Sequence, residues 1–176
     1  MTLTIRDAVE ADLEVLIEMI DLFTVDHPSA HHPRPREIIG PAFFGPDAIL
    51  RAVVAEGRSG VIGYAAWRRG FDYFWAMWGG DLEGLFVRPE ARGRGVAAAL
   101  VARICADVRA QGGVFLRGTY GDDLAPLYER SVFSWPVREA YLAASAFAHM
   151  ADLAGKPVRE IVKGLPAAEL NRIPLG

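Results

Sequence analysis

A glycine turn between a strand and an apolar helix constrains this chain more than any other feature. The sequence predicts a strand over residues 81–87 and a helix over residues 95–111, with Gly93 and Gly95 at the junction. A helix N-terminus carries unpaired amides and roughly half a positive charge. Glycine lets those amides approach a ligand closely, and Arg92 and Arg94 add two cations. We therefore predict a strand–loop–helix unit that binds an anion such as pyrophosphate.

Residues of these types leave several interpretations open. A Walker P-loop would require Gly-Lys-Ser or Gly-Lys-Thr, which the segment lacks. A dinucleotide fingerprint would require Gly-x-Gly-x-x-Gly, and residues 93–98 match it only with Ala in third place. A nicotinamide-dependent oxidoreductase is the function that this partial match would imply. A helix entry that binds nothing is the third interpretation.

The remainder of the chain alternates predicted strands and helices. We expect strands at residues 3–6, 49–55, 61–68, 114–117 and 137–144, and helices at residues 11–23, 36–43 and 123–130. No repeat or linker interrupts them, so we predict one mixed α/β domain over residues 1–176, with a helical tail from about residue 146. The apolar stretch 141–153 suits a surface that covers a second copy, and a homodimer is the arrangement this implies.

Two apolar features predict core packing. Cys105 falls within the apolar pattern of the helix at 95–111, so we expect a small buried side chain there. Five aromatic residues lie close together ahead of Gly79-Gly80, which ends the run. We expect part of this aromatic run in the core and the rest lining a pocket. The five are Phe71, Tyr73, Phe74, Trp75 and Trp78.

Composition narrows the class of protein. Of the 176 residues, 52% are hydrophobic and 23% charged, which is typical of a globular chain. The net charge of -3 provides no basic footprint for nucleic acid, and no apolar run reaches membrane-spanning length. A signal-peptide pattern is missing from residues 1–6, and with a single cysteine this predicts a cytoplasmic protein. His31 and His32 are adjacent and have no acid or Cys partner in the pattern, so we predict no metal.

The signature at residues 85–98 resembles one family closely. Arg92-x-x-Gly95-x-Ala97 follows Leu85-Phe86-Val87-x-Pro89, and the whole resembles the acetyl-CoA signature of the GNAT N-acetyltransferases. Ile5-Arg6-x-Ala8, Val61–Tyr64 and Tyr128-Glu129-Arg130 also resemble family segments, so the likeness covers about residues 3–145. Residues 81–87 weakly resemble the spermidine/spermine and thialysine acetyltransferase branch.

The resemblance implies a fold, a co-substrate and a set of roles. It implies a mostly antiparallel sheet flanked by helices and splayed at the strand that binds acetyl-CoA. Backbone groups of Leu85, Phe86 and Val87 would pair with the pantetheine arm, and Tyr128 would protonate the departing CoA thiolate. The pyrophosphate would be held by Arg92, Gly93, Arg94, Gly95, Val96, Ala97 and Ala98.

Glu83 is our candidate general base. An attacking ammonium must lose a proton before its nitrogen adds to the thioester, and a carboxylate accepts such a proton directly or through water. Strand alternation would put Glu83, Leu85 and Val87 on one face. An ion-paired surface glutamate is an equally weighted alternative.

The expected activity is acetyl transfer from acetyl-CoA to a primary amine of a small molecule, either a polyamine or an amino-acid-like compound. Two positions depart from the family pattern. Gly121-Asp122-Asp123 stands where an Asn is common, and Val132 stands where Gly precedes the Phe of the sixth strand. A non-catalytic acyl-CoA sensor and a protein N-acetyltransferase therefore stay open as alternatives.

Overall fold

The computed structural model describes residues 3–25 and 32–120 of the chain. In chain order the strands are β1 (Thr4–Asp7), β2 (Arg51–Gly57), β3 (Gly60–Asp72), β4 (Met77–Val87) and β5 (Leu116–Gly118). The α-helices are α1 (Leu13–Phe23), α2 (Arg36–Phe44) and α3 (Val96–Ala110). Short 3-10 turns, η1 (Glu10–Asp12) and η2 (Pro89–Ala91), precede α1 and the glycine loop.

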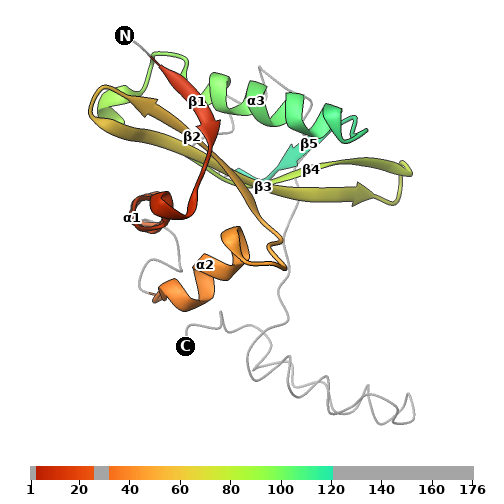
Figure 1. Ribbon diagram of the computed structural model, residues 1–176. Helices are drawn as coiled ribbons and strands as arrows, with labels where there is room; N and C mark the ends of the chain where they lie inside the picture. The colour runs from red at the N-terminus through yellow and green to blue at the C-terminus, as the bar shows by residue number, and fades with distance from the viewer. Residues whose placement is uncertain (1–2, 26–31, 121–176) are drawn as a thin grey trace, which may run out of the picture. The chain divides into compact units, whose positions relative to one another are not determined.

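The five strands form one sheet in sequential order, β1-β2-β3-β4-β5 (Figure 1). The pairs from β1 to β4 are antiparallel, whereas β5 runs parallel to β4. Short turns of two to four residues are enough for the hairpins β2–β3 and β3–β4, but a parallel pair requires a crossover, which α3 provides. The predicted mixed sheet, mostly antiparallel and flanked by helices, is confirmed.

Each face of the sheet has its own core. On one face, α3 buries Val96, Leu100, Ile104 and Val108, spaced four residues apart, against Trp67 and its neighbours. On the other face, α1 buries Leu16 and Met19 against Val54, Tyr64 and Phe86, and α2 adds Phe43. We call these the α3 face and the α1/α2 face. Two buried faces explain why β2 and the middle of β3 read as continuous apolar runs.

A buried carboxylate fixes the connection from β1 to α1. Both oxygens of Asp12 accept hydrogen bonds from the Arg6 guanidinium, at 2.7 and 3.0 Å. The backbone N–H of Val9 donates to the same carboxylate at 2.8 Å. The hydrogen bonds from Arg6 hold the pKa of Asp12 below its usual value, against the effect of burial, and the Val9 N–H assists.

The prediction for the aromatic run was wrong. All five of its side chains are exposed, from 46% for Phe71 and Trp78 to 81% for Phe74. They occupy the outer end of the β3–β4 hairpin, which continues beyond the strands on either side (Figure 1). Neither of the two buried core clusters includes them. The rings contact one another instead, with Phe71 and Trp78 centroids 4.8 Å apart.

The predicted strand start at residue 81 and the predicted burial of Cys105 were also wrong. β4 begins at Met77, so Gly79-Gly80 lies inside it. A Cβ at Gly79 would stand 2.5 Å from Phe115, so glycine here allows a close approach of the chain leading into β5. Cys105 is exposed, because α3 turns its buried stripe through Ile104 and the next residue points away from the sheet.

Candidate functional site

The loop between β4 and α3 has the backbone of an anion cradle. Gly93 and Gly95 have φ values of 71° and 78°, in the left-handed region that favours glycine. A Cβ built at either position meets nothing within 4 Å, so both glycines border open space. No side chain caps α3 and no acid lies in its first turn. The first helical bond there is from Ala99 N–H to the Gly95 carbonyl, which leaves the amides of residues 96–98 directed out of the helix end.

The two arginines of this loop differ in placement. Arg92 Nε donates to the Val87 carbonyl at 2.9 Å, and its guanidinium lies 5.7 Å from the Phe86 ring centroid. Arg92 therefore braces the loop against the end of β4. Arg94 is exposed between the two glycines. Of the small residues that follow, Val96 is buried under the helix, whereas Ala97 and Ala98 are exposed.

β4 separates from β5 after Leu82. Their pairing covers only Gly80–Leu82 against Leu116–Gly118. From residue 83 onward, no strand among the described residues pairs with this edge of β4. The end of the β4–β5 pairing at Leu82 agrees with the splay implied by the family resemblance.

Backbone register decides which groups face that open edge. The Arg88 N–H donates to the Ile62 carbonyl, and alternate residues back along β4, Phe86 and Gly84, bond to β3 in the same way. The backbone groups of Leu85 and Val87 consequently point to the open edge. Phe86, expected to share this role, has its backbone directed to β3 and its side chain in the α1/α2 core.

A β-bulge at Glu83 overturns the predicted face of that residue. Leu82 pairs with Trp67 and Gly84 with Ala66, so β4 has one residue more than β3 at this point. Leu82 and Leu85 therefore both lie on the α3 face. Glu83 lies on the α1/α2 face, where Arg68 Nε donates to its Oε1 at 2.5 Å. The alternation that placed Glu83 with Leu85 and Val87 was wrong because one extra residue resets the pleat.

Glu83 belongs to a chain of ion pairs that crosses three strands. Arg68 on β3 contacts Glu83 and also Asp81, at 3.5 Å. Asp81 in turn contacts Arg117 on β5 at 2.8 Å, and Arg117 contacts Asp72 at 3.1 Å. We call these five residues the β-network. Arg68 and Arg117 were not found by sequence reasoning, because nothing in the local pattern pairs residues this far apart in the chain.

Tyr64 lies next to the β-bulge, near Gly84. Its side chain is buried on the α1/α2 face, and its hydroxyl is 3.1 Å from where a Cβ on Gly84 would be. Burial raises the pKa of this hydroxyl, so Tyr64 stays protonated. Glycine at position 84 thus leaves room for Tyr64 beside Glu83.

The structure does not describe the predicted acid or the departures near it. Tyr128, Gly121-Asp122-Asp123 and Val132 fall outside the described residues, as does the tail from residue 146. No group of three His, Cys, Asp or Glu side chains suited to a metal ion occurs within residues 3–25 and 32–120. In those same residues, no helix is both long and apolar enough to cross a membrane.

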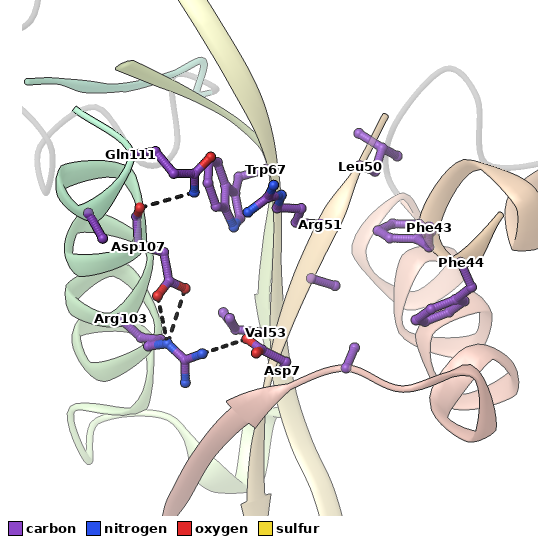
Figure 2. A pocket seen from close by; sticks show the side chains of 13 residues that line it. Asp7, Phe43, Phe44, Leu50, Arg51, Val53, Trp67, Arg103, Asp107 and Gln111 are labelled. Atoms are coloured by element: carbon purple, nitrogen blue, oxygen red, sulfur yellow. Dashed lines mark hydrogen bonds and ion pairs between the residues drawn. The ribbon is translucent and has the colours of Figure 1, made fainter. Parts of the chain in front are cut away.

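A separate hollow of about 340 Å³ lies where β2 extends past β1, between α2 and α3 (Figure 2). Its acids and Arg103 bind one another: Arg103 contacts Asp7 at 2.6 Å and Asp107 at 3.0 Å. Gln111 donates to the Asp107 carbonyl. β3 and β4 separate this hollow from the open edge of β4, so it is not part of the candidate site.

Comparison with known proteins agrees with this geometry. The profile of the acetyltransferase (GNAT) family matches residues 16–132. No curated protein matches the chain. Among solved structures, an aminoglycoside acetyltransferase from an uncultured soil metagenomic sample is 17% identical, with a TM-score of 0.67. That match covers 82% of this chain and 100% of the other.

Two further structures share the fold. An acetyltransferase of Trypanosoma brucei is 22% identical over 81% of this chain and 100% of its own, with a TM-score of 0.62. A ribosomal-protein-alanine N-acetyltransferase of Brucella melitensis is 14% identical over 82% of this chain and 100% of its own, with a TM-score of 0.63. The family match covers most of the described chain, including the glycine loop and the open edge of β4. The chain belongs to the acetyltransferase (GNAT) family and is an acetyl-CoA-dependent N-acetyltransferase.

Proposed function

We propose that this enzyme acetylates a primary amine of a small molecule by direct attack on acetyl-CoA in a ternary complex. The observation that carries the proposal is the open edge of β4, which runs from the glycine cradle at one end to Glu83 at the other. A pyrophosphate at the amides of residues 96–98 would be placed beside the Val87 end of this edge.

The pantetheine arm would then follow the edge as an added strand. The backbone groups of Leu85 and the N–H of Val87 would supply the hydrogen bonds, as in β-augmentation, while the Val87 carbonyl accepts from Arg92. Val87 and Glu83 are four residue steps apart along the strand, about 13 Å at roughly 3.3 Å per step. The thioester would therefore lie at the point where β4 and β5 diverge, next to Glu83.

The chemistry needs three proton transfers. The acceptor ammonium first loses a proton to Glu83, directly or through a water, and its neutral nitrogen then attacks the thioester carbonyl and forms a C–N bond. The nitrogen loses its second proton to water. The tetrahedral intermediate breaks its C–S bond, and the sulfur leaves as a thiolate that takes a proton from Tyr128. The role of Tyr128 rests on the family resemblance alone. A thiol with pKa near ~8.5 and a tyrosine near ~10 are close enough for this transfer.

Release of CoA thiol tests the proposal. The protein is incubated with acetyl-CoA and a panel of primary amines, and free thiol is measured against a sample without amine. We expect amine-dependent thiol release from at least one small amine. Acetyl-CoA binding in a thermal-shift assay without thiol from any amine would instead favour an acyl-CoA sensor. Release only with a peptide N-terminus would favour a protein N-acetyltransferase.

Tyr128→Phe removes the proposed acid and keeps the ring. We expect kcat to fall by about 100-fold, the lower end of typical general-acid effects, while the affinity for CoA is unchanged. Steady-state kinetics and CoA titration measure the two quantities. An unchanged kcat would rule out the acid role.

Glu83→Gln removes the proposed base and keeps the side-chain size. We expect a loss in kcat of about 100-fold with little change in the KM for acetyl-CoA. Glu56→Gln is the matched control, because Glu56 is also a half-exposed strand residue that pairs with an arginine, Arg6, at 2.7 Å. Equal effects of the two substitutions would identify Glu83 as a structural ion-pair partner.

A cytoplasmic location, a homodimer and one domain spanning residues 1–176 stay predictions from the sequence.

A further inference from the structure

The β-network contains three carboxylates and two guanidinium groups, but both guanidinium groups and only one of the carboxylates are substantially exposed. We infer that the acceptor carries an anionic group, a carboxylate or a phosphate, beside its amine, and that Arg68 and Arg117 bind that group. This inference rests on the proposed function, because it assumes that the acceptor amine lies at Glu83.

Exposure separates the five side chains into two sets. The acids between the arginines are largely covered, with side-chain exposures of 15% for Asp81 and 17% for Asp72. The arginines are half exposed, 51% for Arg68 and 50% for Arg117, and Glu83 is 41% exposed. A ligand on this face therefore meets two guanidinium groups and one carboxylate.

The packing explains why Asp81 is covered. It lies on β4 between Arg68 on β3 and Arg117 on β5, and both guanidinium groups contact its carboxylate. Gly70 on β3 has no side chain, and a Cβ there would stand 2.6 Å from Asp81 Oδ2. Asp81 therefore lies close to the sheet and holds the two arginines on either side of it. Arginine forks held in this way suit carboxylate and phosphate oxygens.

The placement of Glu83 completes the pattern. Glu83 stands at the divergence of β4 and β5 and touches Arg68 directly. An ammonium attracted to Glu83 on β4 would therefore have Arg68 on the neighbouring β3 and Arg117 on β5, at the other side of β4. A compound with an amine and an acid a few bonds apart satisfies both charges. A linear polyamine would bring a second cation onto the two arginines and be repelled.

Matched acceptors test this inference. One pair is an aminoalkyl carboxylate and its methyl ester, a second is an aminoalkyl phosphate and the corresponding amino alcohol, and a linear triamine represents the polycations. We expect kcat/KM to be at least ~10-fold higher for the acidic member of one pair than for its neutral partner. The pair that discriminates more strongly identifies the anion as carboxylate or phosphate. Higher kcat/KM for the neutral members or for the triamine would overturn the inference and leave the proposed function standing.

Variants assign the discrimination to residues. Arg117→Gln should reduce the acid-to-neutral ratio toward one by raising the KM of the acidic acceptor, and Arg117→Lys should restore part of it. Arg69→Gln is the control, because Arg69 is the next residue after Arg68 on β3 but lies on the opposite face over Trp78, 4.1 Å from its ring centroid. A ratio that survives in folded Arg117→Gln, or that collapses equally in Arg69→Gln, contradicts the assignment.

A different result would separate this inference from the proposed function. If no amine releases thiol, the proposed function fails. The same acid and neutral compounds, measured as thermal-shift ligands of the CoA-loaded protein, then decide the inference by themselves. Stronger stabilisation by the acids would support an anion site in the β-network, and equal stabilisation would reject it.

Discussion

Asp12 is a buried carboxylate whose oxygens are satisfied by Arg6 and by the Val9 N–H. This places the end of β1 and the start of α1 at a fixed distance from one another. The cost of losing such an acceptor is larger than the net worth of one hydrogen bond, because two nitrogens of the partly covered guanidinium lose their carboxylate and only Nε keeps one, that of Glu56.

We predict that Asp12→Asn lowers the free energy of unfolding by about 1–3 kcal/mol at pH 7. Because the folded pKa of Asp12 is depressed, its contribution is present above the unfolded pKa of about 3.9 and is lost as the pH falls through the folded value. Urea unfolding from pH 7 to pH 2.5 should therefore show the wild-type and Asn curves converging in acid.

The exposed Asp47 provides the control, since Asp47→Asn should leave stability unchanged at every pH. A difference between wild type and Asp12→Asn that stays constant down to pH 2.5 would show that charge on Asp12 is not the cause.

At the level of elements, the glycine cradle is where strand, loop and helix meet. Gly95 begins α3 and has a left-handed φ of 78°, and Gly112, which follows the helix, has the same φ. A Cβ at either position meets nothing within 4 Å. The two glycines are therefore matched in strain and in space, and differ in which end of the helix dipole they face.

Gly95→Ala and Gly112→Ala should each cost about 1 kcal/mol of stability from backbone strain. Only Gly95→Ala should also weaken CoA binding, by about tenfold or more, because its methyl group occupies the space open to a phosphate. Isothermal titration with CoA and thermal unfolding measure both quantities. Equal CoA affinity in the two variants would place the pyrophosphate away from this loop.

The elements show what local sequence can and cannot predict. The helix at 95–111 and the glycine turn before it were predicted nearly to the residue, because helix period, helix end and glycine chemistry are all local. The bulge at Glu83 was missed, because it exists only relative to β3. The same holds for Arg68, whose partner is on another strand, and for Gly79, whose role depends on the approach of Phe115.

Hydrophobic patterns in the sequence also gave wrong predictions for Cys105 and for the aromatic run. Cys105 was assigned to the apolar stripe although it lies one residue past Ile104, and the helix turned it outward. The aromatic run was predicted to be partly buried, because aromatic side chains usually are. A hairpin projects from its sheet when the strands on either side are shorter than its own. The lengths of those neighbouring strands cannot be predicted from residues 71–78.

At the scale of the whole molecule, the projecting end of the β3–β4 hairpin leaves five aromatic side chains in solvent. Tyr73 and Phe74 have ring centroids 4.1 Å apart, and Trp75 follows them at 65% exposure. These rings stabilise the hairpin tip locally, while the two cores lie on the sheet behind them.

We therefore predict that Phe74→Ser combined with Trp75→Ser changes the free energy of unfolding by no more than about 0.5 kcal/mol. Trp67→Ala, on the same hairpin but buried under α3, should lower it by about 3–5 kcal/mol. Chemical denaturation of both variants measures the contrast. A large loss from the serine pair would mean that these rings are covered in solution.

The single extra residue in β4 changes which residues of that strand, odd- or even-numbered, face α3. Downstream of the bulge, odd-numbered residues such as Leu85 and Val87 lie toward α3, whereas upstream the even-numbered Leu82 does. Deleting Gly84 would remove the bulge, with Glu83 taking its place opposite Ala66 and Leu82 staying opposite Trp67, so each side chain would keep its face. In a strand without the bulge, residues two apart such as Glu83 and Leu85 would share a face, whereas here they lie on opposite faces. Any comparison of related chains that shifts a gap by one position here would therefore assign one of the two to the wrong face.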